Sequence, residues 1–468
     1  MRPRVAWWAF AAVAAALALF GAAHWISAVL LDGPVTYGEG AVAHAAILAR
    51  ERVEYVPGAR YGDLAPIFTA ANYPPLYFRL AGIGDPFLTG RAISIVSTLF
   101  VAVAIAWRAR PAGPLVAATI ALAWLGAVPV LQWGAALKPD LLALAMTVAA
   151  VLVLERAHPS YAAAGVLLGI AALAKPTALL PAIAIFVFVA RQDTRAAVRG
   201  MASAVAAALV IGVLTFSPDQ SALVHVLNWN ALPWRLELVA PLVLLALLVL
   251  AVPLATIAVT RPSRTVVTAY AAGATAILFL GGREGATINY FLDLSAALAL
   301  AIAGRAPRLS GGTTYPLAAV AQLAVGVALL NPFGIIPGRA VTTGAWGDPG
   351  RIAQVRDLSG VLLVEDSGLL VANGREPIVD DLFLWSRVHA TGRPFPEGEA
   401  LLAAVRSTRF DAIVSEADLQ RLDGAPGYEG QRWHPDLVAA VLDRYELSRH
   451  LEGAGSSPGL FVYVPRAR

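Results

Sequence analysis

The chain has 468 residues, of which 58% are hydrophobic and only 14% carry a charge, and its mean hydropathy is +0.67. This composition excludes an ordinary soluble protein and indicates one that crosses a membrane several times. The net charge of +4 does not indicate nucleic acid, because the arginines are scattered between apolar runs, and the absence of cysteine excludes disulfides and thiolate-bound zinc.

The first apolar segment covers residues 5–31 and follows Arg2 and Arg4. Small residues near Gly21 resemble a signal-peptide cleavage site. The apolar length is nearer the roughly 20 residues that cross a bilayer than the roughly 7 to 15 of a signal-peptide core, and more apolar runs follow. We therefore expect this segment to be the first transmembrane helix.

Ten further apolar runs are candidates for membrane-spanning helices. They cover residues 91–107, 114–133, 140–154, 161–174, 176–190, 200–216, 236–259, 265–281, 288–303 and 315–332. Several of these runs are short, and two of them meet at Lys175 and Pro176. The sequence predicts a polytopic α-helical membrane protein with about eleven transmembrane helices, within a range of about ten to thirteen.

Arginines gather at alternate ends of these runs. Besides Arg2 and Arg4, they are Arg108, Arg110, Arg156, Arg191, Arg195, Arg199, Arg261, Arg264, Arg305 and Arg308. By the positive-inside rule, these ends face the cytoplasm. The opposite ends carry nearly all acids of the membrane region, namely Asp32, Glu39, Glu51, Glu54, Asp63, Asp85, Asp140, Asp219, Glu237, Glu284 and Asp293. Because acids have little weight in topology, this clustering is separate information, and it indicates a working face outside the cytoplasm.

The first outer loop, residues 32–90, holds the two carboxylates of greatest interest. Asp32 follows the first apolar segment, and Glu39 has a glycine on each side. A carboxylate at the edge of a bilayer is costly to bury and can serve as a general base. The alternatives are a turn at Asp32, which precedes Gly33 and Pro34, and an acid in the first turn of a helix at Glu39.

The same loop contains an aromatic and proline-rich stretch at residues 72–78, with the sequence Asn-Tyr-Pro-Pro-Leu-Tyr-Phe. Tyrosines favour the headgroup zone and prolines end helices, so the stretch fits an interfacial belt. It also fits a substrate cleft in which Asn72 and Tyr77 contact the donor or the acceptor, with a ring stacked on a sugar. Both interpretations stay open at this point.

The only two lysines of the chain, Lys138 and Lys175, each precede a proline and lie at the outer mouth of an apolar run. A cation in this position pairs with an acid or binds a phosphate, and the sequence leaves both open. A glycine-rich stretch at residues 281–291 lies on the same face and contains Arg283. Glycines with one arginine suit a phosphate cradle, but a re-entrant turn with a pair between Arg283 and Glu284 explains them as well.

From about residue 340 the composition becomes that of a soluble domain, since 18 of the 31 acids lie between there and the end. Strands are predicted at residues 361–364, 412–414 and 460–464, and amphipathic helices at 399–407 and 436–445. The sequence therefore predicts a small α/β domain over residues 340–468. With an odd number of spans before it, this domain is expected outside the cytoplasm.

Four short motifs occur in order on the outer face: Tyr-Gly-Glu-Gly at 37–40, Asn-Tyr-Pro-Pro-Leu-Tyr at 72–77, Lys-Pro-Asp at 138–140 and Lys-Pro-Thr at 175–177. Together they resemble the GT-C superfamily of membrane glycosyltransferases, and within it the protein mannosyltransferase and aminoarabinose transferase group. The resemblance covers residues 1–335, and the last 130 residues resemble an extra domain. It implies a multi-pass protein of the plasma (inner) membrane, with a catalytic domain at 1–335 and an extracytoplasmic α/β domain at 340–468.

The resemblance implies transfer of a hexose-like sugar from a polyprenyl-phosphate donor to a glycan, lipid or protein acceptor, with inversion at the anomeric carbon. A carboxylate of the first outer loop would be the base, and Glu39 fits that position better than Asp32. The family often has an adjacent acidic pair there, whereas these two acids are seven residues apart. The donor phosphate would bind to Arg283, Lys175 and Lys138. The substrate cleft would be lined by Tyr37, Asn72, Tyr73, Tyr77, Asp140, Glu284, Asn289 and Tyr290.

The competing interpretation is a transporter or flippase of a lipid-linked or polar solute, which also places ionisable groups in a polytopic bundle. Such a protein is expected to pair charges near the bilayer midplane and to have repeated halves, whereas here the acids crowd one face and no repeat is apparent. A scaffold that displays the C-terminal domain is the third possibility. No spacing of His, Asp and Glu indicates a metal site. We expect no cofactor, and the sequence leaves open whether a divalent metal takes part.

Overall fold

Helices lie over each of the apolar runs that the sequence predicts as spans. The computed structural model describes residues 2–56, 66–216, 222, 224–260, 264–337, 346–393, 396–422, 431–453 and 459–467; Asp63, Asp219 and Arg261 lie outside these residues. The chain divides into two units. We call one the helical unit, with Met1–Ile26, Arg91–Leu214 and Trp234–Gly344, and the other the α/β unit, with Ser27–Gly90, Thr215–Pro233 and Ala345–Arg468.

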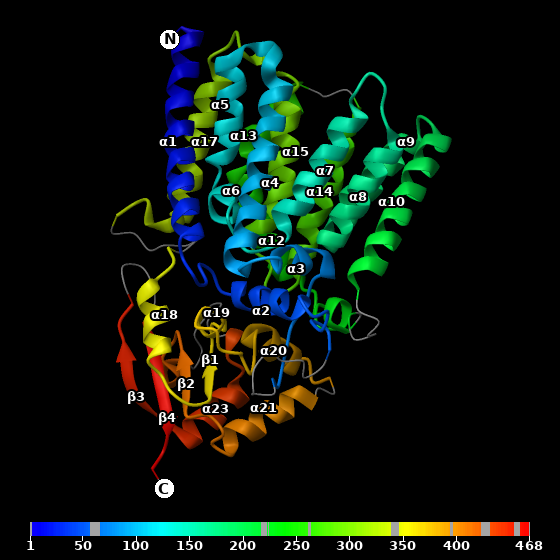
Figure 1. Ribbon diagram of the computed structural model, residues 1–468. Helices are drawn as coiled ribbons and strands as arrows, with labels where there is room; N and C mark the ends of the chain where they lie inside the picture. The colour runs from blue at the N-terminus through cyan, green and yellow to red at the C-terminus, as the bar shows by residue number, and fades with distance from the viewer. Residues whose placement is uncertain are drawn as a thin grey trace. The chain divides into compact units, whose positions relative to one another are not determined.

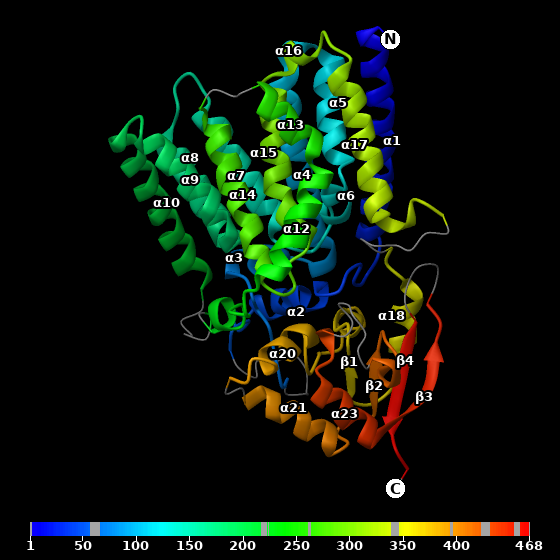
Figure 2. The ribbon, with the colours of Figure 1, turned by 180° about the vertical axis from the view of Figure 1, so that it is seen from behind.

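The helical unit is a bundle whose main helices run side by side (Figures 1 and 2). Its helices are α1 (Pro3–Val29), α4 (Pro86–Ala109), α5 (Pro114–Leu125), α6 (Val128–Trp133), α7 (Asp140–Leu154), α8 (Tyr161–Ala174), α9 (Leu179–Ala190), α10 (Thr194–Thr215), α12 (Leu236–Val249), α13 (Ala251–Thr260), α14 (Val266–Phe279), α15 (Leu292–Ala303), α16 (Ala306–Leu309) and α17 (Thr314–Leu330). Neighbouring helices pack through aromatic rings, as where Trp7 of α1 meets Tyr315 of α17 at 5.9 Å between ring centroids.

Few of these helices are long enough to cross a bilayer by themselves. Among the described residues, the helices at Pro3–Val29, Pro86–Ala112 and Thr194–Thr215 pass by length and apolarity, and α12 with α13 passes as one span bent by 72°. The bend follows from Pro253, which has no N–H to donate to the carbonyl four residues earlier. The remaining apolar helices have 10–17 residues, which at 1.5 Å per residue is shorter than a hydrocarbon core of about 30 Å. The number of eleven spans therefore stays a prediction.

Small residues let two of the helices approach closely. Gly165 and Gly169 of α8 are four residues apart and face α10, where an added methyl group would overlap the carbonyl oxygen of Gly200 or lie 2.5 Å from that of Ala204. A Gly-x-x-x-Gly face of this kind brings two backbones together in membrane helices, where van der Waals contact replaces the hydrophobic effect. Any larger residue at these two positions is expected to separate α8 from α10.

The α/β unit is built around a four-stranded sheet of order β1-β2-β4-β3, in which β1 and β2 are parallel and the other pairs antiparallel. Its elements are α2 (Glu39–Ala49), α3 (Pro75–Ala81), a π-helical turn (Val224–Asn228), α18 (Pro349–Arg356), β1 (Leu362–Val364), α19 (Gly368–Val371), α20 (Leu382–His389), α21 (Pro396–Arg406), β2 (Ala412–Ser415), α23 (Pro435–Arg444), β3 (Tyr445–Leu451) and β4 (Leu460–Pro465).

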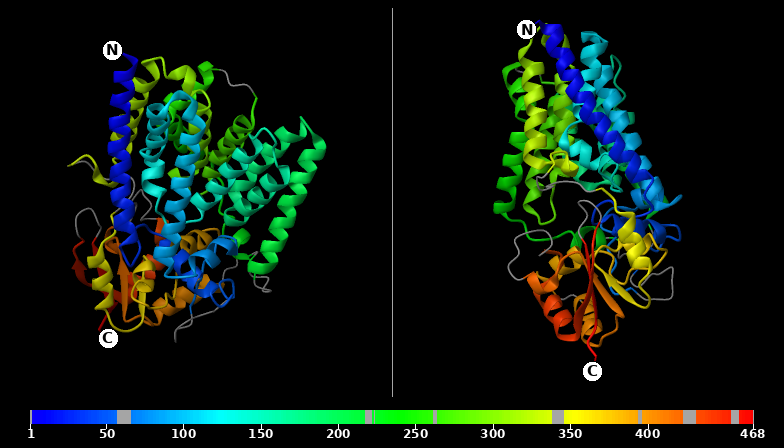
Figure 3. Two further views of the ribbon diagram at one scale, coloured as in Figure 1. Left: turned by 45° about the horizontal axis from the view of Figure 1, so that its top comes forward. Right: turned by 90° about the vertical axis from the view of Figure 1, so that its left-hand side faces the viewer.

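Helices cover both faces of this sheet (Figure 3). Because successive strand residues point to opposite faces, Leu362 and Val364 of β1 pack with α18 and α19. Leu363 between them packs with α20, α21 and α23 on the other face. The short hydrophobic runs of the strands are thus buried on both sides, as in other sheets with a helical layer on each face.

The predicted strands at 361–364, 412–414 and 460–464 correspond to β1, β2 and β4, and the predicted helices at 399–407 and 436–445 to α21 and α23. The sequence analysis missed β3, because this edge strand has the sequence Tyr-Glu-Leu-Ser-Arg-His-Leu and most of its residues are exposed. A strand of this kind lacks the alternation of apolar residues that marks a half-buried strand.

The first loop packs with the C-terminal residues in the α/β unit, whereas the sequence analysis had grouped residues 1–335 as one domain. Phe68 forms an isolated parallel bridge with Val379, and its ring lies 4.4 Å from that of Trp229. Segments from three distant parts of the sequence therefore share one core. The residues after 345 therefore belong to the same unit as the loop that contains Glu39.

Candidate functional site

In the helical unit, an ion pair joins two of the predicted site residues at neighbouring helix ends. Asp140 is the first residue of α7, and Lys175 directly follows α8. Lys175 is held in an extended conformation (φ −146°, ψ 120°), as expected for a residue that precedes a proline. Its Nζ forms an ion pair with Asp140 Oδ1, and both side chains are largely buried. Lys175 therefore pairs with an acid, which is one of the two roles that the sequence left open for it.

The glycine-rich stretch contributes the rest of this cluster. Asn289 donates to Asp140 Oδ1 at 2.9 Å, and the ring centroid of Tyr290 lies 5.5 Å from Lys175 Nζ. Arg283 contacts the same side chain, with its Nη2 3.4 Å from the phenolic oxygen of Tyr290. We call these five residues the lysine cluster. It brings together residues from three separate sequence motifs, and it holds two cations with one carboxylate.

Glu284 has a partner that the sequence analysis did not include among the site residues. Its Oε1 lies 2.5 Å from Nη2 of Arg235. The backbone N–H of Arg235 donates to the carbonyl of Gly282 at 2.8 Å, so the start of α12 and this stretch are fastened together. Lys138 is half-buried, and its carbonyl accepts from the Ser94 hydroxyl at 3.4 Å.

In the α/β unit, Glu39 is the first residue of α2 and follows Gly38, whose φ of 80° suits glycine. Its side chain is fully buried, and Oε2 accepts the backbone N–H of Val35 at 2.8 Å. This bond closes the turn between the two residues. Asp32, in contrast, is exposed at the bend that leaves α1. Neither environment by itself decides which of the two acids is a base.

The aromatic stretch is held by hydrogen bonds within the α/β unit. Tyr77 is fully buried and its hydroxyl donates to Gly90 at 3.3 Å, so this ring has no free face for a sugar. The backbone carbonyl of Tyr73 accepts from Tyr55 at 2.5 Å, and that of Asn72 accepts from the Asn230 side chain at 2.9 Å. The side chains of Asn72 and Tyr73 are half-buried and stay candidates for a cleft.

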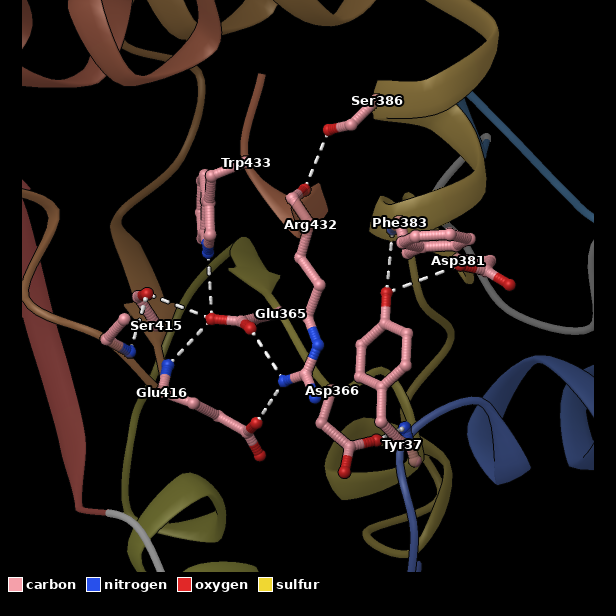
Figure 4. A network of polar contacts seen from close by, with 12 residues as sticks. Tyr37, Glu365, Asp366, Asp381, Phe383, Ser386, Ser415, Glu416, Arg432 and Trp433 are labelled. Carbon is pink, nitrogen blue, oxygen red and sulfur yellow. Dashed lines mark hydrogen bonds and ion pairs between the residues drawn. The ribbon is translucent and has the colours of Figure 1, made fainter. Parts of the chain in front are cut away.

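Sequence reasoning missed a buried polar network in the α/β unit (Figure 4). Glu365, at the end of β1, accepts four hydrogen bonds, from the Ser415 hydroxyl, the Glu416 backbone, Trp433 Nε1 and Arg432 Nη1, at 2.7–2.9 Å. Glu416 in turn forms ion pairs with Arg432 and Arg351. We call this set, with Asp366, the C-terminal network. Its partners lie far apart in sequence, so no local pattern could have indicated it.

Asp366 is the member of the network that titrates near neutrality. Burial raises its pKa most, and the negative charge of Glu416 raises it further, to about 7, although the Arg351 guanidinium acts in the opposite direction. Its Oδ1 accepts the backbone N–H of Gly368 at 3.0 Å. The two guanidinium groups outweigh burial at Glu416 and lower the pKa of that carboxyl.

An apolar cavity, part of it open to the outside, lies in the helical unit among α1, α5, α12, α13, α15 and α17. Its lining includes Phe10, Ile120, Leu250, Ile302 and Leu323. The indole N–H of Trp124, one of the few polar groups there, donates to the Ser295 hydroxyl at 3.1 Å. With its polar groups paired in this way, the cavity is suited to hydrocarbon.

Known proteins resemble the chain in sequence and in fold. Residues 65–223 match the model of glycosyltransferase family 87, which is a minority of the chain. The crystal structure of ArnT from Cupriavidus metallidurans bound to undecaprenyl phosphate has a TM-score of 0.54 at 15% identity and covers 96% of this chain and 97% of its own. The chain has the fold of the GT-C glycosyltransferases. The resemblance to this superfamily, inferred from the sequence motifs, is thereby confirmed.

Two further solved structures show similarity to the chain. ArnT in the apo state has a TM-score of 0.53 at 14% identity, with the same coverage. The oligosaccharyltransferase of Archaeoglobus fulgidus has a TM-score of 0.46 at 12% identity and covers 96% of this chain and 74% of its own, a likeness too weak to carry an argument. No curated protein sequence matches the chain.

One group of side chains among the described residues could hold a metal ion. The ligand atoms of His389, His434 and Asp436 lie within 4.8 Å of one another in the α/β unit. His434 Nδ1 already accepts the backbone N–H of Asp436 at 3.2 Å, because it caps the start of α23. Any ion bound through this nitrogen would compete with that cap, so we assign no chemistry to the group.

Proposed function

We propose that the protein is a glycosyltransferase that moves a sugar from a polyprenyl-phosphate donor to an acceptor hydroxyl at the extracytoplasmic face of the plasma membrane. The observation that carries this proposal is the similarity to ArnT bound to undecaprenyl phosphate, which extends over nearly all of both chains. The match of residues 65–223 to glycosyltransferase family 87 supports the same reaction type.

The lysine cluster supports a role in binding the donor phosphate. Arg283 contacts the hydroxyl of Tyr290, and Lys175 Nζ lies 5.5 Å from the centroid of the same ring. Each cation has a polar contact that a phosphate oxygen could replace. A cation beside the departing phosphate stabilises the charge that develops on it. In the absence of the donor, Asp140 neutralises Lys175 and is itself bound by Asn289. A buried ammonium without such a partner would cost free energy of folding. Lys138 is the third candidate on the same motif as Asp140.

In the proposed reaction Glu39 removes the proton of the acceptor hydroxyl, with Asp32 as the alternative base. The acceptor oxygen forms a bond to the anomeric carbon from the opposite side, the bond from that carbon to the phosphate oxygen breaks, and the lipid phosphate leaves with the electron pair. The configuration at the anomeric carbon is inverted. Because Glu39 is buried by its own chain, the acceptor must displace some of these contacts to reach it.

The rest of the proposal concerns the lipid and the location of the domains. The apolar cavity in the helical unit is suited by its lining to part of a prenyl chain. The arginines at alternate helix ends favour a cytoplasmic side opposite the first loop, so that the residues after 345 lie outside the cytoplasm. A divalent metal has no part in the proposed step.

The experiment compares the purified wild type with Glu39→Gln and Asp32→Asn for sugar transfer from a panel of polyprenyl-phosphate sugars to membrane extract. Loss of the base should lower kcat by about 10²–10⁴ in one of the two variants. Thermal unfolding in detergent checks that each variant is folded. Undiminished transfer in both folded variants would remove the proposed base, and absence of transfer by the wild type from every donor would overturn the proposed function.

A further inference from the structure

Residues 366–383 of the C-terminal region contact the chain on both sides of Glu39. At one contact two glycines bring backbones together. A methyl group on Gly40 would overlap the backbone nitrogen of Gly368 and the hydroxyl of Ser367, and a methyl group on Gly368 would lie 2.7 Å from Cβ of Pro34. Figure 1 shows α2 beside α19, and these two helices carry the two glycines. The first turn of α2 is therefore seated directly on the start of α19.

At a second contact, Tyr37 reaches the start of α20 (Figure 4). Its hydroxyl accepts the backbone N–H of Phe383 at 2.8 Å and donates to Asp381 Oδ1 at 3.3 Å. The guanidinium carbon of Arg432, from the C-terminal network, lies 4.1 Å from the centroid of the Tyr37 ring. The ring and the hydroxyl are thus both engaged by C-terminal residues, although the sequence analysis assigned Tyr37 to the substrate cleft.

A third contact follows one turn into α2. His44 is fully buried, with Nδ1 3.1 Å from Asp380 Oδ2 and Nε2 3.9 Å from Glu376 Oε1. Burial lowers the pKa of His44, but the two carboxylates outweigh it, so that the pKa is raised and the charged form is favoured. The same Asp380 oxygen accepts the backbone N–H of Ala70 at 3.0 Å. One carboxylate therefore fastens two parts of the first loop.

We propose that residues 366–383 position Glu39, so that the C-terminal region completes the catalytic loop of the enzyme. This inference rests on the proposed function. The contacts at Tyr37, Gly40 and His44 lie before and after Glu39, and the bond from Val35 then fixes its carboxylate. A base transfers a proton only over hydrogen-bond distance, and a displacement of about 1 Å can cost about 10²-fold in rate. Tyr37 and Gly40 are positioning residues in this scheme.

The test uses two variants of different severity and one control. Tyr37→Phe removes a hydroxyl and keeps the ring over Arg432, whereas Gly40→Ala places a methyl group against α19. Gly311→Ala is the matched control, because a methyl group there would meet nothing within 4 Å. We expect Tyr37→Phe to lower kcat between about tenfold and a hundredfold, with the KM for the lipid donor and the melting temperature unchanged. Gly40→Ala should have a larger effect in the same direction.

A second measurement does not depend on activity. The chain has no cysteine, so Thr36→Cys supplies a single thiol next to Tyr37, and its rate of maleimide labelling reports how firmly the loop is held. We expect labelling several-fold faster when Tyr37→Phe or Gly40→Ala is added, and no change with Gly311→Ala.

Three outcomes are decisive. Equal labelling rates and an unchanged kcat in both loop variants would overturn the positioning role. A lower melting temperature with an unchanged kcat would assign the contacts to stability alone and overturn it as well. With no transfer by the wild type the proposed function fails, while faster labelling of the loop variants would still support the attachment of the loop to residues 366–383.

Discussion

The lysine cluster of the helical unit and the C-terminal network of the α/β unit hold their buried charges in different ways. Among the described residues, Lys175 forms an ion pair with Asp140, and Arg283 contacts the hydroxyl of Tyr290. Glu365 accepts four hydrogen bonds, and Arg432 contacts Glu365, Glu416 and the ring of Tyr37.

The difference indicates that buried charges have two roles in this protein, namely binding a ligand and fixing chain segments. Lys175 can exchange its ion pair with Asp140 for one with a phosphate of the donor at small cost, because one ion pair replaces another. A charge with three or four partners on different segments fixes those segments and has no capacity for a ligand. We therefore expect substitutions in the lysine cluster to affect substrate binding and substitutions in the C-terminal network to affect folding first.

The largest effect is expected from Arg432→Met. This change leaves Glu365 without its buried cation and leaves Glu416 with Arg351 alone, and breaking a buried pair typically costs about 3–5 kcal/mol. Thermal unfolding in detergent measures the loss. Arg444→Met is the control, since that arginine is half-exposed and pairs with exposed Asp443. Equal melting temperatures for the two variants would show that the network does not stabilise the α/β unit.

An intermediate effect is expected from Lys175→Gln, which should raise the KM for the lipid donor between about tenfold and a hundredfold. The reason is the loss of one charge-assisted contact with the phosphate, which contributes about 1.5–3 kcal/mol. Asp140→Asn sharpens the comparison, because it removes the carboxylate that competes with the phosphate for Lys175. Donor binding should stay intact or tighten in that variant. If both variants melt early and bind the donor normally, the ion pair is structural and the donor phosphate is bound elsewhere.

The smallest effect is a change in the pH dependence of stability through Asp366. Its pKa of about 7 in the folded protein lies above the unfolded value of about 4, so the folded protein keeps a proton that the unfolded chain has lost. Stability is therefore lost as the pH rises from about 4 to about 7. Asp366→Asn should lack this part of the loss when melting curves at pH 5 and pH 8 are compared. Asp357→Asn, at an exposed position, should follow the wild type, and an unchanged profile for Asp366→Asn would contradict the assignment.

Much of the lysine cluster could be predicted from the sequence, because its members stand out locally. Lys138 and Lys175 are the only lysines, each precedes a proline, and Arg283 lies among glycines. Rarity and position were enough to select the residues. The pairing was not, since a cation at a helix end can take an acid or a phosphate, and only the fold places Asp140 beside Lys175.

The α/β unit was harder to predict for the opposite reason. Glu365, Glu416 and Arg432 are common residue types in an acidic region, and their burial depends on partners 16 to 67 positions away. His44 lies in a run of alanines that resembles an ordinary apolar helix, and its partner Asp380 is 336 positions away. Long-range pairing of polar groups has no periodic signature. Hydrophobic alternation still located β1, β2 and β4.

The separation in sequence between α2 and its supports also has a consequence for biosynthesis. The contacts of Tyr37, His44 and Ala70 with residues 380–383 join positions 310 to 346 residues apart. At about 5–20 residues per second, the ribosome needs on the order of 15–60 seconds to synthesise that many residues. During this time the first loop lacks its contacts with residues 380–383. If residues 366–383 position Glu39, the nascent chain cannot consume its donor during synthesis. Under this proposal, activity begins only after residues 366–383 have been made and have folded onto α2.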